Sequence, residues 1–253
     1  MPAVAEGPVS APPDQPGVQS PNALWRLIRA CTTAAGKDLY PPRPCVEVEM
    51  PRGSANHYAV LKDREGRYQY LVLPLARITG IESPTLLAPG APNYFADAWT
   101  ARLYVEAALH RRLPRDQLSL VVNSAYGRSQ NQLHIHVDCT RPDVHDALQR
   151  MLPNITTQWR PLPMPLPPNG HAYQARWVDG ETLTLNPFQS LAASLPAGDH
   201  MARHSLIVAG AVSPSGKPGF ILLSGRVDWR KGDHATGDEL QDLACTIAAR
   251  SSP

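Results

Sequence analysis

In the first third of the chain, apolar residues first recur at helical spacing and then gather in short runs typical of strands. Apolar residues at helical spacing after Asn22 predict a short amphipathic helix that ends near Gly36. A stretch with many prolines, residues 39–51, should then be an extended loop. Two apolar runs, 57–62 and 68–74, are joined by a short glycine-containing connection, which is typical of a pair of antiparallel strands.

The middle of the chain continues with one helical period and two short apolar runs. Apolar residues every four positions predict a helix over 93–112, which should cover one face of the sheet. Strands are expected over 118–123 and 133–139, separated by a polar, glycine-containing turn over 124–130. The order strand, strand, helix, strand, strand predicts an α+β fold with an antiparallel sheet.

The second half of the chain repeats this order in a weaker form. A helix after Arg141 leads to a Pro-rich stretch, 158–168, which we expect to be an irregular linker. The elements expected beyond it are a strand near 171–178, a helix near 187–195, strands over 205–212 and 219–223, and a closing helix over 240–249. The repeated order suggests that the second half is a degenerate duplicate of the first.

These patterns predict a division of the chain into three parts. Residues 1–21 are rich in Pro, Ala, Gly and Ser and are expected to be a disordered leader or the remnant of a trimmed anchor. Residues 22–154 form the first α+β half, and residues 155–253 form a second half packed on it. With 253 residues, 43% of them hydrophobic, the chain can bury one large core or two modest ones.

Charge and cysteine content narrow the possible partners and compartment. The formal net charge is +2 without long runs of either sign, so we expect no broad nucleic-acid surface, while a small anionic ligand remains compatible. No apolar stretch is long enough to span a bilayer, and the chain as given is expected to be soluble. The four cysteines contain no Cys-x-x-Cys pair, so two disulfides and four buried thiols are both open, with three connectivities for the disulfides.

The strongest chemical signal is the pair His134 and His136 on a predicted strand. Side chains two positions apart on a strand emerge on the same face, so the two imidazoles should share one pocket while Leu133, Ile135 and Val137 pack into the core. Taken alone, the pair could be structural, could bind a metal, or could hold a nucleophile and its partner.

The context of this pair resembles the signature of the histidine-triad superfamily. Tyr70-Leu-Val-Leu-Pro is followed by a strand that ends in Asn123, by the turn Ser124 to Gln130, and by the strand Leu133-His-Ile-His-Val. The resemblance covers about residues 55–140. A closer similarity, over nearly the whole chain, is to the bacterial CDP-diacylglycerol pyrophosphatase family. The segments that carry this similarity are Pro44-Cys45, Ala59-Val-Leu-Lys-Asp63, Gly80-Ile-Glu-Ser-Pro84, Pro92-Asn-Tyr-Phe95, Gly127-Arg-Ser-Gln-Asn131 and Cys139-Thr-Arg-Pro-Asp143.

This resemblance implies hydrolysis of CDP-diacylglycerol to CMP and phosphatidate, without a cofactor or metal. It also implies the disulfides Cys31–Cys45 and Cys139–Cys245 and a place on the periplasmic side of the inner membrane, at a membrane surface. Members usually begin with an anchoring segment, and the first residues of this sequence are not expected to form one. A nucleotidyltransferase, a non-catalytic nucleotide-binding module and a metal site built from His134, His136 and Asp138 are the competing interpretations.

The implied mechanism is attack by a neutral imidazole on a phosphorus atom, giving a nucleotidyl-histidine that water resolves. In the favoured register His134 is the first triad residue, His136 the nucleophile, and Asp138 replaces the third histidine. In the other register Gln132 replaces the first histidine and His134 is the nucleophile. The expected substrate-binding residues, besides the backbone N–H groups of the turn, are Asn123, Arg128, Gln130, Gln132, Asp138, Lys62 and Tyr126.

Overall fold

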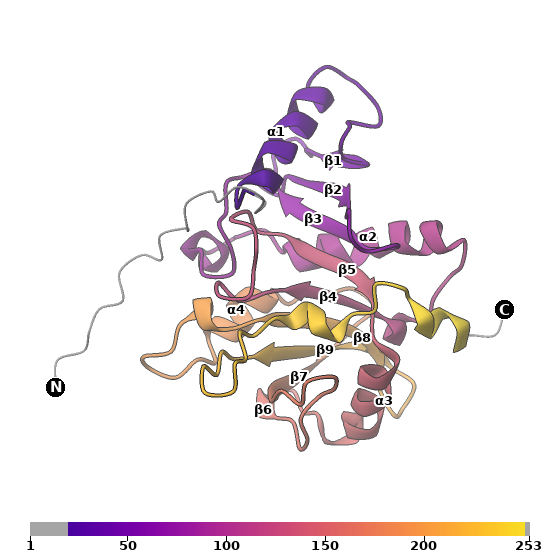
Figure 1. Ribbon diagram of the computed structural model, residues 1–253, viewed down its shortest axis with the longest axis vertical. Coiled ribbons are helices and arrows are strands. Elements are labelled where there is room, and N and C mark those ends of the chain that lie inside the picture. The colour runs from indigo at the N-terminus through magenta and orange to yellow at the C-terminus, as the bar shows by residue number, and fades with distance from the viewer. Residues whose placement is uncertain (1–19, 251–253) are drawn as a thin grey trace.

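The strands of the chain form one antiparallel sheet. The computed structural model describes residues 20–250, and their nine strands follow the order β1-β2-β3-β5-β4-β8-β9-β7-β6 (Figure 1). The strands are β1 (Glu47–Glu49), β2 (Tyr58–Lys62), β3 (Tyr70–Pro74), β4 (Leu118–Val122), β5 (Ile135–Cys139), β6 (Arg160–Pro161), β7 (Tyr173–Asp179), β8 (Leu206–Val212) and β9 (Pro218–Gly225). The predicted α+β class with an antiparallel sheet is confirmed.

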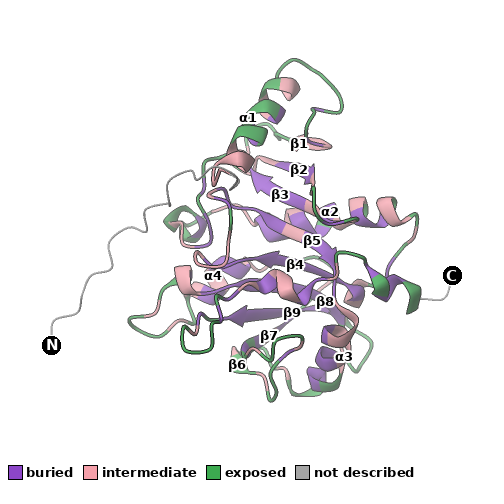
Figure 2. Ribbon diagram, viewed as in Figure 1, coloured by how far each residue is buried: buried purple, intermediate pink, exposed green. Residues whose placement is uncertain are grey.

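Four α-helices cover the two faces of this sheet. They are α1 (Ala23–Ala35), α2 (Tyr94–Leu109), α3 (Pro142–Met151) and α4 (Pro187–Ala192). Helices α2 and α4 share one buried cluster on the back face, where the rings of Phe95 and Phe188 lie 5.0 Å apart. Helices α1 and α3 pack on the opposite, front face. Figure 2 shows the central strands buried and the outer side of α1 exposed.

The front face is defined by a row of side chains that the strand register brings together. Paired residues on neighbouring strands point to the same side of the sheet. From β2 to β7 the row is Leu61, Leu71, His136, Val121, Ile207, Leu223 and Ala175. Six of these seven side chains are apolar, so one imidazole interrupts an otherwise apolar surface.

The two halves of the chain have the same strand arrangement. Inside the extra edge strand β1, the first half contributes β2, β3, β5 and β4 from the outside inwards, and the second half contributes β6, β7, β9 and β8. Strands β4 and β8 pair along the seam, with Leu120 opposite Val208. The chain order within each half is also the same, so the repeat predicted from the sequence is present in the topology.

Each half also covers the front face of the other. Helix α3, from the first half, packs its buried residues on β7, β8 and β9. The C-terminal segment, from the second half, crosses the front face beside β4 and β5 (Figure 1). There Asp242 donates its backbone N–H to Cys139 and Gln241 forms an isolated bridge with Thr140. The halves are therefore joined by exchanged segments as well as by the sheet.

The predicted disulfide pairing is confirmed, because Cys31 is bonded to Cys45 and Cys139 to Cys245. The first disulfide fixes α1 to the loop before β1, and its two sulfurs lie in the buried cluster under that helix. The second ties β5 to the C-terminal segment. Both bonds thus anchor segments that cover the front face of the first half, and they are consistent with an oxidising environment.

Three local predictions are wrong. The Pro-rich stretch is no linker, because β6 pairs with β7 and Leu166 is fully buried; an edge strand tolerates proline, whose missing N–H faces away from the sheet. The predicted loop 39–51 contains edge strand β1, whose three residues lie between the prolines of this stretch. The closing helix is replaced by short 3₁₀ turns at Gly237–Leu240 and Thr246–Arg250, since the bridge to Thr140, a turn closed by the Cys245 N–H on the Asp242 carbonyl, and the disulfide fix the residues between them in a non-helical path. Residues 1–19 of the predicted leader lie outside the described residues.

Candidate active site

A cavity of about 630 Å³ lies on the front face beside the beginning of β5. This volume is in the usual range for small-molecule sites. Five residues predicted from the sequence line it, namely Lys62, Asn123, Gln130, His134 and His136. The other lining residues come from α1, the loop before β1, the end of β2 with its following turn, β3, the turn between β4 and β5, and the C-terminal segment.

The alternation of β5 places the two histidines in this cavity. Leu133, Ile135 and Val137 point to the back face and are buried in its core. His134 and His136 therefore point to the front, where their ring centroids are 4.9 Å apart. The expectation that both imidazoles share one pocket is confirmed.

The tautomer of His134 is set by the backbone. Its Nδ1 lies 2.7 Å from the carbonyl oxygen of Gln132, which can only accept a hydrogen bond, so Nδ1 carries the proton and Nε2 has the free lone pair. Gln132 is itself fixed, because its amide nitrogen donates to the carbonyls of Pro74 and Ala76. Burial, with a smaller contribution from His136, lowers the pKa of His134 to about 3. The ring is therefore neutral at physiological pH.

A chain of amides sets the tautomer of His136. Gln241 donates its amide nitrogen to the carbonyl of Ser119, so its oxygen faces the amide nitrogen of Gln69 at 3.4 Å. The oxygen of Gln69 then lies 3.3 Å from Nδ1 of His136, which must donate. Nε2 of His136 is buried and has no partner among the described residues. Burial lowers the pKa of His136, opposed by Asp238 and Asp63, so this imidazole is also neutral.

Asn123 and Gln130 are held at the rim by segments distant in sequence. Asn123 donates its amide to the Asp238 carboxylate at 3.1 Å and accepts the backbone N–H of the same residue. The Gln130 side chain accepts the backbone N–H of Leu24, at the start of α1, and donates to the carbonyl of Ser20. The two amides thus connect the turn after β4 to the two segments that cover it.

Lys62 supplies a cation at the end of β2. Its ammonium group donates to the backbone carbonyls of Asp63 and Gly66. Burial lowers the pKa of Lys62, opposed by the carboxylates of Asp63 and Asp138. With two of its three protons engaged by carbonyls, Lys62 keeps one donor for a ligand.

The turn between β4 and β5 is folded on the side chain of Ser124. Its hydroxyl accepts the N–H groups of Tyr126 and Gly127 and donates to the carbonyl of His234. Gly127 is needed here because a Cβ would lie 2.7 Å from the Thr236 hydroxyl. The N–H groups of the cavity-lining residues Ser129 and Gln130 make no hydrogen bond within the described part of the chain.

Four predicted substrate-binding residues lie outside the cavity lining, namely Gln132, which is fixed by the backbone carbonyls described above, and Arg128, Tyr126 and Asp138. Both terminal nitrogens of Arg128 are bound by the Glu82 carboxylate, at 2.8 Å for one of them, so its predicted phosphate contact gains no support. Tyr126 packs its ring on Trp229, with centroids 5.1 Å apart, instead of on a ligand. Asp138 is fully buried further along β5, and one of its oxygens accepts the backbone N–H of Cys139.

Asp138 also bears on the alternative of a metal site. Burial raises its pKa to about 7, against the Cys139 hydrogen bond, which lowers it. Within residues 20–250 no group of three or more His, Cys, Asp or Glu side chains is arranged to hold a metal ion. The His134, His136 and Asp138 set therefore does not form such a group.

Several residues of the site were not predicted. Gln69 and Gln241 orient the His136 imidazole, Asp238 orients Asn123, and an apolar wall faces them from α1, the loop before β1 and the adjoining strands. This wall consists of Leu24, Leu27, Pro44, Leu61 and Leu71. Leu71 pairs with His136, and Gln69 lies two residues before Leu71, so both side chains point to the face that carries His136. Knowledge of the pairing between β3 and β5 would therefore have placed Gln69 at the site. No sequence signal links Gln241 to His136 across 105 positions.

The comparisons with known proteins point to one family. The family described as CDP-diacylglycerol pyrophosphatase matches residues 19–249. A protein of Yersinia pestis named CDP-diacylglycerol pyrophosphatase is 40% identical over 228 residues, which are 89% of this chain and 84% of that protein. The described helices include none with the length and apolar character of a bilayer-spanning segment.

Proposed function

The chain belongs to the CDP-diacylglycerol pyrophosphatase family, and we propose that it hydrolyses CDP-diacylglycerol to CMP and phosphatidate through a nucleotidyl-histidine on His134. The cavity supports this substrate because it combines two kinds of wall. Imidazole, amide and ammonium groups on one side suit a nucleotide diphosphate, while the leucines of α1, β2 and β3 on the other suit the glycerol and acyl part.

One observation carries the choice of His134 over His136. A nucleophilic imidazole needs a neutral ring whose lone pair is aimed at phosphorus. The Nδ1 proton of His134 is held at 2.7 Å by a backbone carbonyl, whereas that of His136 is held at 3.3 Å by a side-chain amide. The more rigid contact favours the register in which Gln132 replaces the first histidine of a triad. The register that makes His136 the nucleophile stays a prediction with weaker geometric support.

The reaction then proceeds in two displacements. Nε2 of His134 attacks the phosphorus of the cytidylyl group, a P–N bond forms, and the P–O bond to phosphatidate breaks, so phosphatidate leaves as an anion. Water next attacks the same phosphorus and releases CMP as the P–N bond breaks, while its proton passes to His136 or to solvent. Lys62, the N–H groups of Ser129 and Gln130, and the Asn123 amide are the donors available to the phosphate oxygens.

The second half takes part by enclosing this site, without a nucleophile of its own. Gln241 and Asp238 act through His136 and Asn123, and the C-terminal segment is fixed by Cys139–Cys245. The two disulfides support a location in an oxidising compartment, which we propose is the periplasmic side of the inner membrane. The predicted relation to the histidine-triad superfamily is consistent with this mechanism and stays a prediction.

The test uses the full chain and CDP-diacylglycerol in water enriched in heavy oxygen. We expect CMP and phosphatidate as products, with the heavy oxygen in CMP alone, because water attacks the cytidylyl phosphorus. A rapidly quenched reaction should yield a cytidylyl adduct on the peptide that contains His134. Absence of turnover would overturn the proposed function, and heavy oxygen in phosphatidate would overturn the proposed direction of attack. An adduct on His136 would restore the other register.

A further inference from the structure

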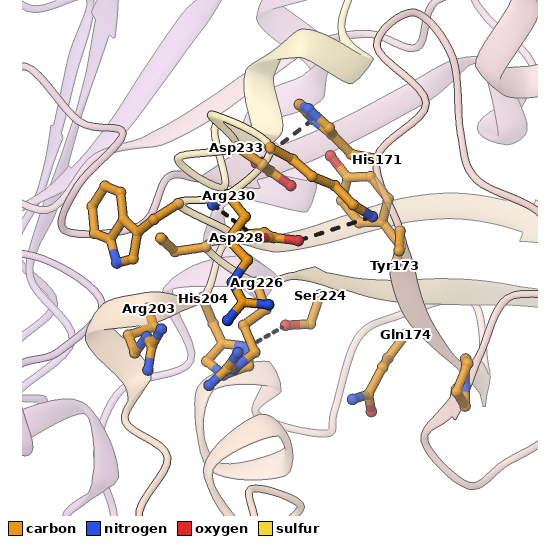
Figure 3. A pocket seen from close by; sticks show the side chains of 15 residues that line it. His171, Tyr173, Gln174, Arg203, His204, Ser224, Arg226, Asp228, Arg230 and Asp233 are labelled. Atoms are coloured by element: carbon orange, nitrogen blue, oxygen red, sulfur yellow. Dashed lines mark hydrogen bonds and ion pairs between the residues drawn. The ribbon is translucent and has the colours of Figure 1, made fainter.

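A second cavity, of about 690 Å³, lies in the second half and shares no lining residue with the active site. It is formed by the residues just before β8, the start of β7, the end of β9 and the loop that follows β9. Figure 3 shows Arg203, Arg226 and Arg230 gathered in the same part of this cavity, beside His204. Nothing in the proposed reaction uses these residues.

The cavity has more cationic than acidic side chains. Four cationic groups line it, from Arg203, Arg226, Arg230 and Lys231, against the two carboxylates of Asp228 and Asp233. The guanidinium groups of Arg203 and Arg230 form no ion pair or hydrogen bond with any described residue. An arginine fork without a carboxylate partner, beside others of the same charge, is suited to bind a phosphate group.

Buried groups hold the third arginine in place. One oxygen of Asp199 accepts a hydrogen bond from Nε of Arg226 at 2.8 Å and lies 3.2 Å from Nε2 of His204. The other ring nitrogen of His204 is 3.0 Å from the Ser224 hydroxyl. The Asp199 and His204 side chains are 9% and 3% exposed, so the support is rigid. Held through Nε, Arg226 keeps both terminal nitrogens for a ligand.

The loop above the cavity ends in an exposed aromatic and basic tip. Asp228 and Asp233 exchange two backbone hydrogen bonds, which close a tight loop with Gly232 at a φ of +67°. Trp229 is 53% exposed at this tip, and the two residues that follow it, Arg230 and Lys231, are also exposed. A tryptophan flanked by cations is the side-chain combination found at membrane–water interfaces.

The same loop supports the active-site turn. Trp229 packs on Tyr126, and the carbonyl of His234 accepts the hydroxyl of Ser124. A surface that docks through this loop would therefore lie next to the entrance of the catalytic cavity.

We propose that this cavity and loop tip are a docking site for an anionic phospholipid at a bilayer surface. Arg203, Arg226 and Arg230 would bind the lipid phosphate, and Trp229 would enter the interface. Two arguments favour a lipid over a soluble phosphate. The first is the exposed Trp229. The second rests on the proposed function, because CDP-diacylglycerol resides in a bilayer.

The experiment measures binding of the full chain to vesicles of phosphatidylcholine with and without phosphatidylglycerol, by flotation. We expect Arg203→Gln/Arg230→Gln to bind the anionic vesicles about tenfold or more weakly, because each basic residue near such a surface contributes appreciably to binding. The matched control is Arg52→Gln/Arg150→Gln, which removes the same charge from two exposed positions outside the cavity. It should weaken binding by less than about twofold, because salt screens charges that lie far from the docked surface. Trp229→Ala should weaken binding several-fold without changing charge.

The outcomes separate docking from catalysis. His134→Ala should bind vesicles normally, and the arginine double variant should hydrolyse dispersed short-chain substrate at the normal rate. Equal loss of binding in both double variants, or equal binding to neutral and anionic vesicles, would overturn the docking site. Displacement of the protein from vesicles by glycerol phosphate at the same phosphate concentration would show that the cavity takes a soluble ligand, which would overturn the lipid as its occupant. An inactive wild-type chain that docked as expected would count against the proposed function alone.

Discussion

The two halves of this protein share one strand arrangement and differ in the chemistry of their front faces. In the first half, β5 and the residue before it present His134, His136 and Asp138 to the front, and α1 covers this surface incompletely, leaving the catalytic cavity. In the second half, the corresponding strand β9 presents Ile221 and Leu223, which α3 covers. The difference shows that the sheet alone does not create the site. Polar residues on one strand, and the incomplete cover over them, do.

The exchange of covering segments makes the halves mutually dependent. Helix α3 belongs to the first half in sequence but packs on the strands of the second half. The C-terminal segment belongs to the second half but packs on β4 and β5 of the first half. Each half therefore keeps its own strands while the other half supplies part of its cover. Most of the following predictions separate the contribution of the shared framework from that of the polar face.

The largest effect is expected when the second half is removed. A fragment of residues 22–154 would expose the β4 edge and four buried residues of α3, namely Val144, Ala147, Leu148 and Met151. At roughly 1.5 to 3 kcal/mol for each large apolar side chain, the loss is comparable with the whole stability of a typical domain. We expect no cooperative urea transition and no hydrolysis. A cooperatively folded fragment as active as the full chain would show that the halves are independent.

The next largest effect is a loss of catalytic activity that leaves the stability of the fold unchanged. His134→Ala should lower kcat for CDP-diacylglycerol by about 10⁴-fold or more, as expected for loss of a nucleophile. His136→Ala should retain more activity, and the exposed His200→Ala in the second half serves as the control. Thermal unfolding of all three should stay close to that of the unchanged chain. The opposite ranking of His134 and His136 would assign the nucleophile to His136.

The disulfides test how firmly each covering segment must be fixed. Cys139–Cys245 closes a loop of 106 residues and Cys31–Cys45 one of 14. The chain-entropy model predicts losses of about 4.7 and about 3 kcal/mol when the respective pairs are replaced by alanine. Urea midpoints of the two double variants would measure the difference. Equal losses would mean that loop closure does not control the stability of the segments.

The smallest predicted effect is the loss of folding stability caused by ionisation of the buried Asp138 carboxyl group. Burial raises the pKa of Asp138 to about 7, above the usual value for an unfolded chain. The folded state then holds its proton more tightly, so stability is full below about pH 4 and is lost as pH rises towards about pH 7. The loss should be roughly 2 to 4 kcal/mol.

Asp138→Asn keeps the shape and should remove this part of the pH dependence. Urea unfolding between about pH 4 and pH 8 would measure it, with Asp38→Asn at an exposed position as the control. An unchanged slope in Asp138→Asn would show that the carboxyl group is ionised in the folded protein.

Local patterns in the sequence were sufficient for most of the elements and for the two histidines. Alternation along residues 133–139 placed His134 and His136 on one face, and the family resemblance implied the correct cysteine pairs. The Pro-rich stretch and the closing segment were misjudged for a common reason. Both are held by distant strands, β7 in one case and β5 in the other, and pairing with a neighbour overrides what local composition favours.

The sequence by itself determined which residues could react, because the side-chain period of a strand is a local property. Only the tertiary structure decided how they are arranged. Gln241 orients His136 through Gln69, Asp238 holds Asn123, and Glu82 removes Arg128 from the cavity. The physical reason is that a hydrogen bond depends on position in space to a few tenths of an ångström, while separations of 46 to 172 residues along the chain carry no such information.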